Sequence, residues 1–117
     1  MNDLLVSPTF IDASVSVTSK RHLLLSLAQR VAAPYGVEER DVLEALQARE
    51  QEGSTGAGDG VAIPHAKLAG LTRTVTYFAR LENPVDYDSL DDEPVDLIFL
   101  ILAPESANGD HLTLLAR

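Results

Sequence analysis

Apolar residues recur at intervals of three and four in two stretches of the chain, which is the pattern of an amphipathic helix. The first stretch begins after Thr18-Ser19, a favourable N-cap pair, and Pro34 is expected to end it. Its apolar face carries Leu23, Leu24, Leu27, Ala28 and Val31. We interpret this helix as a packing element and His22 within it as an ordinary surface or partly buried histidine.

The second helical stretch is expected to begin near Glu38 and to run to about Gln51, with Gly53 as its terminator. Acidic residues in its first turn lie at the positive end of the helix dipole, which stabilises the helix. Its apolar face is made by Val42, Leu43 and Leu46. This assignment places Arg49 in the last turn, close to the glycine-rich segment that follows.

Strand patterns occupy much of the remaining chain. Residues 15–17 form a short alternating pattern, residues 74–81 alternate over a longer run, and residues 95–102 are almost continuously apolar. A continuous apolar run is typical of a strand buried on both faces, so helices should cover both sides of the sheet. We therefore predict an α/β fold, a single domain over residues 1–117 with a mixed central β-sheet and helices on both faces.

Composition limits the possible functions. The 117 residues include no cysteine, which excludes disulfides and thiolate metal sites, and no apolar run approaches the roughly 20 residues of a membrane span. The N-terminus lacks the pattern of a signal peptide, so we expect a cytoplasmic protein. The formal charge of −9 argues against nucleic acid or an anionic membrane as a partner.

Acidic residues concentrate between Glu82 and Asp96, in a segment that contains no Lys or Arg. One interpretation is a solvated loop. The other is a surface that contacts or steers a basic protein partner.

The glycine-rich segment 53–60 leads into a short apolar stretch that stops at Pro64, and His65 follows. Successive glycines let backbone N–H groups point inward, so this segment could bind an anion such as a phosphoryl group. It is not a nucleoside-triphosphate loop, because Asp59-Gly60 stand where Lys and then Ser or Thr are required. It is not a dinucleotide loop, because it leaves a helix and opens a strand, and Val61 replaces the third glycine.

From the residues alone, His65 is either a structural turn residue or a reactive imidazole at the mouth of this segment. A metal site made by His65, Asp110 and His111 is disfavoured, because the chain contains no close-spaced ligand pair. We therefore expect neither a metal nor a cofactor.

The run GSTGAGDGVAIPHAK, residues 53–67, is preceded by Arg49-Glu50 and followed by PVDLIF at 94–99 and by Asp110-His111-Leu112. Together these segments resemble the fructose/mannitol-type enzyme IIA domain of the bacterial phosphoenolpyruvate-dependent phosphotransferase system, and within it the nitrogen-regulatory IIA branch. The resemblance extends over nearly the whole chain. It implies that His65 accepts a phosphoryl group from a histidine phosphocarrier protein of the HPr or NPr kind.

The resemblance also implies the rest of the site. Arg49 and a second histidine, His111, would accompany His65 as catalytic residues. Backbone N–H groups and hydroxyls would bind the phosphate from Ser54, Thr55, Gly56 and Gly58. The family usually has Asn where this chain has Asp59, so we expect the Asp59 carboxylate to face away from the pocket as part of a turn.

The resemblance leaves several partners open. The nitrogen-regulatory branch implies a regulatory target protein and a nitrogen- or potassium-linked role, whereas the sugar-transport branch implies onward transfer to a IIB domain. A third alternative is a protein-binding module that phosphorylation switches without onward transfer. The resemblance implies C-terminal helices beyond the sequence given, so we expect the sheet side with Ile98 and Leu100 to be uncovered and to favour self-association.

Overall fold

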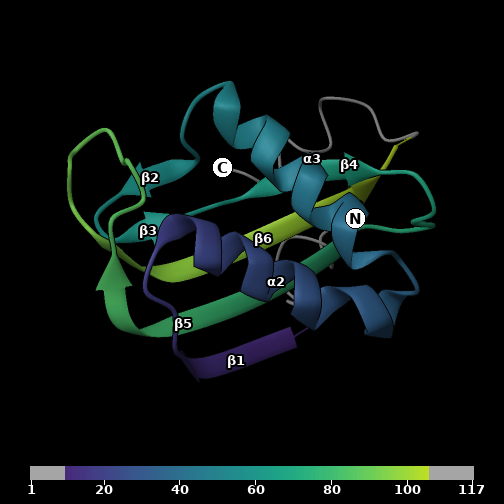
Figure 1. Cartoon of the computed structure of the whole chain (residues 1–117), viewed down its shortest axis with the longest axis horizontal. Coiled ribbons are helices and arrows are strands. Elements are labelled where there is room, and N and C mark those ends of the chain that lie inside the picture. Colours follow the sequence, from purple (N-terminus) through teal and green to yellow (C-terminus); the bar gives the residue numbers. More distant parts are fainter. Residues whose placement is uncertain (1–9, 106–117) are drawn as a thin grey trace.

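A mixed six-stranded sheet and two helices make up residues 10–105, the part of the chain that this computed structural model describes (Figure 1). In chain order the elements are β1 (Phe10–Val15), α2 (Lys20–Tyr35), α3 (Glu39–Gln51), β2 (Gly56–Gly58), β3 (Val61–Ala62), β4 (His65–Leu68), β5 (Val75–Val85) and β6 (Val95–Pro104).

The two long strands β5 and β6 pair antiparallel, and β1 runs parallel to β5 on one side of them. On the other side β3 and β4 both run parallel to β6, one after the other, and β2 pairs antiparallel with β3. The strand order is therefore β1-β5-β6-β3-β2, with β4 also beside β6. The predicted α/β class with a mixed sheet is confirmed, whereas the domain limits of 1 and 117 stay a prediction.

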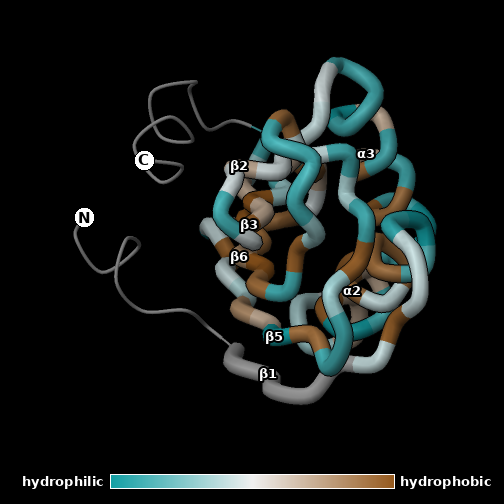
Figure 2. The backbone as a smooth tube through the Cα atoms, turned by 90° about the vertical axis from the view of Figure 1, so that its left-hand side faces the viewer, coloured by the Kyte–Doolittle hydropathy of each residue, from teal (hydrophilic) through white to brown (hydrophobic). Residues whose placement is uncertain are grey.

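Both described helices pack on the same face of the sheet, and the apolar segments gather where the helices meet the strands (Figure 2). From the helices the core takes Leu23, Leu27, Val31, Val42 and Leu46, and from the strands it takes Tyr77, Ala79, Ile98, Leu100 and Leu102. Burial of each large side chain contributes about 1.5–3 kcal/mol to folding. Within residues 10–105, neither helix is long and apolar enough for a membrane span.

The opposite face of the sheet carries a second row of apolar side chains. Phe78, Leu97 and Phe99 are half-buried there, and the Phe78 and Phe99 rings meet edge to face with centroids 6.5 Å apart. The expectation that Ile98 and Leu100 lie on an uncovered side is wrong, because both are fully buried under the helices. Within residues 10–105 both helices lie on the first face, so helices on the second face stay a prediction. Self-association also stays a prediction.

The ends of α2 agree with the predicted cap but not with the predicted stop. The Ser19 side chain accepts a hydrogen bond from the His22 N–H at 3.0 Å and caps the helix. The helix then continues through Pro34 to Tyr35, and Gly36, whose φ of 67° is left-handed, is its C-cap. Pro34 costs the helix one hydrogen bond, because it has no N–H to donate to the carbonyl four residues earlier.

Three other boundaries differ from the sequence prediction. The first strand is Phe10–Val15, not residues 15–17, because parallel pairing with β5 defines it. Strand β5 continues to Val85, and Pro84 lies in the part of it where the pairing with β6 is irregular. Helix α3 has the predicted span, but its C-cap is Glu52 in a right-handed conformation, one residue before Gly53.

Candidate functional site

Strands β3 and β4 lie end to end along β6 and are separated by Ile63 and Pro64. At this break the Ile63 N–H donates to the Thr55 carbonyl at 2.9 Å, and the Ile101 N–H donates to the Pro64 carbonyl at 3.0 Å. The break leaves the Ile63 carbonyl free to turn toward the ring of His65, the first residue of β4. Pro64 favours such an interruption because it cannot donate a ladder hydrogen bond.

The hydrogen bonds of His65 define the state of its imidazole. Nδ1 lies 2.8 Å from the Ile63 carbonyl oxygen, and Nε2 accepts a hydrogen bond from Nε of Arg49 at 3.2 Å. A carbonyl can only accept and a guanidinium N–H can only donate, so the proton belongs on Nδ1 and the lone pair on Nε2. The structure thus presents a neutral ring whose nucleophilic nitrogen is Nε2.

Arg49 reaches this ring from the last turn of α3. Its Nη1 donates to the Gly53 carbonyl at 2.9 Å, which holds the guanidinium beside the end of the helix. Next to it an open hollow of about 460 Å³ is lined by Ala45, Ala48, Arg49, Glu52, His65, Ala66 and Lys67. The half-buried imidazole and the two cationic side chains, Arg49 and Lys67, suit a small anion, whereas the Glu52 carboxylate in the same lining opposes one.

The glycine-rich segment is a small hairpin, with β2 and β3 joined by Asp59 and Gly60. Both turn residues have positive φ, 57° and 82°, as expected for an Asp-Gly hairpin turn. Asp59 is exposed, and its N–H donates to the Asp91 carboxylate at 3.0 Å. The backbone N–H groups of Asp59 and Glu93 lower the pKa of Asp91. Asp59 is therefore the turn residue that the sequence predicted.

The four residues expected to bind phosphate have other partners in the structure. The Ser54 hydroxyl donates to the Tyr87 carbonyl at 2.9 Å and accepts from the Gly56 N–H at 3.1 Å. The buried Thr55 hydroxyl donates to the Glu50 carboxylate and lies 3.1 Å from the Tyr87 hydroxyl. Gly56 lies against Ser89 and Gly58 against Asp91. The acidic segment packs on the hairpin and contacts these residues. Their binding of a phosphoryl group at His65 stays a prediction.

Among the residues expected to be catalytic, the structure brings His65 and Arg49 together. His111 lies outside the described residues, so its position relative to His65 stays a prediction.

Comparison with known proteins places this site in a family. The family model described as "Phosphoenolpyruvate-dependent sugar phosphotransferase system, EIIA 2" matches residues 4–117. The chain belongs to this EIIA 2 family. It is 50% identical over 97% of its length to a nitrogen regulatory protein of Bradyrhizobium diazoefficiens, of which it covers 74%. It is also 44% identical, over 85% of its length, to the nitrogen regulatory protein of Pseudomonas aeruginosa, and it covers 65% of that protein.

A solved structure agrees with this assignment. The nitrogen regulatory protein IIA-Ntr of Neisseria meningitidis superposes with a TM-score of 0.84 at 42% identity, over 91% of this chain and 73% of that one. The resemblance inferred from the sequence, an enzyme IIA domain most similar to the nitrogen-regulatory branch, is thus confirmed.

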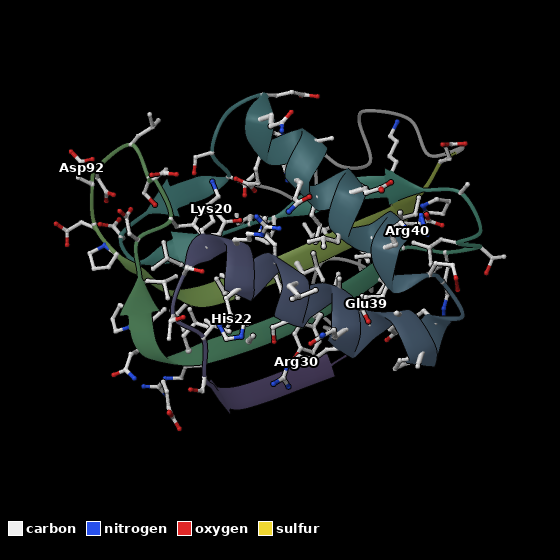
Figure 3. All side chains as sticks on the ribbon, viewed as in Figure 1. Lys20, His22, Arg30, Glu39, Arg40 and Asp92 are labelled. Carbon is white, nitrogen blue, oxygen red and sulfur yellow. The ribbon has the colours of Figure 1, made fainter. Side chains whose placement is uncertain are left out.

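Glu50, the residue after Arg49, belongs in this EIIA 2 chain to a buried polar cluster that sequence reasoning missed. The Glu50 side chain is 7% exposed, and its carboxylate accepts from the Thr55 N–H at 3.0 Å, the Thr55 hydroxyl and the Tyr87 hydroxyl at 2.9 Å. Lys20, labelled in Figure 3 at the start of α2, lies 3.0 Å from the carboxylate and 4.5 Å from the centre of the Tyr87 ring.

The cluster keeps Glu50 ionised despite its burial. Burial alone would raise the pKa of Glu50, but the hydrogen bonds from Thr55, Lys20 and Tyr87 outweigh it and lower that pKa. Burial also raises the pKa of Tyr87, so its hydroxyl keeps its proton and donates. One signal was present in the sequence, because a carboxylate in the last turn of a helix is disfavoured by the dipole and needs compensating donors.

The close contact between the hairpin and the acidic segment gives a test of this packing. A Cβ added at Gly56 would lie 2.2 Å from Oγ and 3.1 Å from Cα of Ser89. We therefore expect Gly56→Ala to lower the free energy of unfolding by about 1–3 kcal/mol, the usual cost of overpacking. Denaturant titration measures this, and Ser89→Gly should reduce the cost in a double-mutant cycle. Equal midpoints for Gly56→Ala and the parent chain would contradict the packing.

Proposed function

We propose that this chain is a phosphoryl carrier of the phosphoenolpyruvate-dependent phosphotransferase system. In this proposal Nε2 of His65 accepts the phosphoryl group from a histidine phosphocarrier protein. The observation that carries it is the pair of hydrogen bonds at the ring, which keeps the proton on Nδ1 and directs the lone pair of Nε2 toward Arg49. Membership of the EIIA 2 family supports the same reaction.

The transfer needs no external base. The Nε2 lone pair attacks the phosphorus, the N–P bond of the carrier's phosphohistidine breaks, and its electron pair returns to the carrier's ring. Nδ1 of His65 already holds its proton, so the product ring is positively charged, and the Ile63 carbonyl faces that charge. A protonated ring is also a good leaving group, which suits onward transfer.

Arg49 would supply the electrostatic part of the catalysis. Phosphoryl transfer depends on in-line positioning and on donors to the equatorial oxygens. The Arg49 guanidinium is held 3.2 Å from the attacking nitrogen, and Lys67 lines the same hollow. We propose that these cations bind the phosphoryl oxygens as the group arrives, with His111 as a second histidine of the site.

For the output of this reaction we favour a regulatory, nitrogen- or potassium-linked role toward a target protein. The relatives named nitrogen regulatory protein support that choice. The alternative is transfer to a separate IIB domain, which would be seen as loss of label from the phosphorylated chain when a IIB protein is added. The reaction would take place in the cytoplasm.

The direct test is phosphorylation in a reconstituted relay. The chain is incubated with labelled phosphoenolpyruvate, enzyme I and a phosphocarrier protein, and the modified residue is mapped by mass spectrometry and nitrogen NMR. We expect one acid-labile phosphate on Nε2 of His65, and none when the phosphocarrier is omitted. A chain without label, or with label on another residue or on Nδ1, would contradict the proposal.

A further inference from the structure

A path of hydrogen bonds joins the buried carboxylate of Glu50 to the ring of His65. Glu50 accepts from the Thr55 N–H at 3.0 Å, and the carbonyl of Thr55 accepts from the Ile63 N–H at 2.9 Å. The Ile63 carbonyl then lies 2.8 Å from Nδ1 of His65. The backbones of Thr55 and Ile63, through the N–H and the carbonyl of each residue, therefore lie between Glu50 and the nitrogen that holds the ring proton.

A second path reaches the other ring nitrogen through the neighbour of Glu50. Arg49 donates to Nε2 of His65 at 3.2 Å and to the Gly53 carbonyl at 2.9 Å. Segment 49–55 therefore positions both hydrogen-bond partners of the imidazole. Arg49 belongs to the segment, and the Ile63 backbone bonds to the Thr55 carbonyl. Glu50 is the buried side chain that ties the two ends of this segment together, through Thr55.

Donors from three parts of the chain hold the Glu50 carboxylate in place. Lys20 comes from α2, the Thr55 donors come from the residue before β2, and the Tyr87 hydroxyl comes from the acidic segment. A carboxylate with this many donors cannot shift without leaving some of them unpaired in a buried place, which is costly. Its position is therefore well determined, and so is the position of the Thr55 peptide that it binds.

We propose that Glu50 is a positioning residue for His65. It holds the backbone of Thr55, and through the Thr55 carbonyl that of Ile63, so that the Ile63 carbonyl keeps the ring proton on Nδ1 and leaves Nε2 as the nucleophile. The inference rests on the proposed function for the use of Nε2, but it concerns the tautomer of the unphosphorylated ring.

A structural role alone makes a different prediction. If Glu50 served stability only, its replacement would lower the unfolding temperature but leave the tautomer of the folded protein unchanged. The tautomer ratio of His65 therefore separates the two roles, and nitrogen NMR of the full chain with labelled histidine measures it from the shifts of Nδ1 and Nε2.

We expect the parent chain to show mainly the Nδ1–H form. Glu50→Ala should raise the proportion of the Nε2–H form by about fivefold, the factor that corresponds to one net hydrogen bond. Glu50→Gln keeps an oxygen that can accept from Thr55, so its tautomer ratio should stay near that of the parent although it loses the ion pair with Lys20. Glu44→Ala, an exposed position on the same helix, is the matched control.

A folded Glu50→Ala chain with the parent tautomer ratio would overturn the proposal. If that variant does not fold, Glu50→Asp decides, because its shorter side chain keeps the charge but draws the carboxylate away from Thr55. A rise of twofold or more in the Nε2–H form of Glu50→Asp supports the proposal, and an unchanged ratio overturns it. The readout needs no phosphorylation, so this result and the relay assay can fail independently.

Discussion

Replacement of His65 by alanine is expected to reduce phosphorylation of the chain to background while the protein still unfolds cooperatively. The proposed reaction needs the Nε2 lone pair, and the half-buried His65 begins a short strand outside the main core. Loss of its two hydrogen bonds should lower the free energy of unfolding by only about 1–3 kcal/mol. Transfer of label from the phosphocarrier, followed with thermal unfolding, measures both effects.

The control for this experiment is a second histidine of the described chain. His22 is exposed on α2, where its ring lies near Thr18, so His22→Ala should take up label at the parent rate. Normal labelling of His65→Ala, or loss of labelling in His22→Ala, would show that the acceptor has been misassigned.

Replacement of Arg49 by alanine is expected to slow phosphoryl transfer by about ten- to a hundredfold. A charge-assisted hydrogen bond contributes roughly 1.5–3 kcal/mol, and about 1.4 kcal/mol corresponds to a factor of ten in rate. Arg49→Lys should recover only part of this loss, because an ammonium cannot supply the two-pronged donor of a guanidinium. Single-turnover transfer from the phosphorylated carrier measures the rate.

Arg40 provides the matched control, because it is an exposed arginine on the same helix (Figure 3). Arg40→Ala should transfer at the parent rate, which would separate the role of Arg49 from a general loss of positive charge on α3. If Arg49→Ala and Arg40→Ala both matched the parent, Arg49 would have no part in the reaction.

Local patterns predicted the helices well. The periodicity of α2 and α3 follows from one buried face, and the Ser19 cap and the span of α3 lie where the sequence placed them. The pairing of Arg49 with His65 came from the resemblance to a family. The two residues are 16 positions apart, and such a spacing does not by itself indicate a contact.

Packing between distant segments explains what the sequence did not predict. In the glycine-rich segment the Ser54 hydroxyl bonds to Tyr87, the Thr55 hydroxyl to Glu50 and the Asp59 N–H to Asp91, contacts that the sequence did not reveal. Phosphate binding by this segment stays a prediction. The apolar run of β6 is continuous and shows no alternation, so the sequence did not indicate which of its residues face the helices. Because adjacent strand residues point to opposite faces, only the observed register shows that Ile98 is buried while Phe99 lies on the other side.

The break between β3 and β4 also affects how the edge of the sheet meets other chains. Within the described residues β4 pairs with β6 alone, so its outer backbone groups offer a template on which a foreign strand could extend the sheet. Three features oppose such strand addition: β4 has only four residues, Pro64 precedes it and Lys67 lies within it. A short, charged edge of this kind is a poor seed for aggregation, so the strand that begins with His65 resists pairing with strands of other chains.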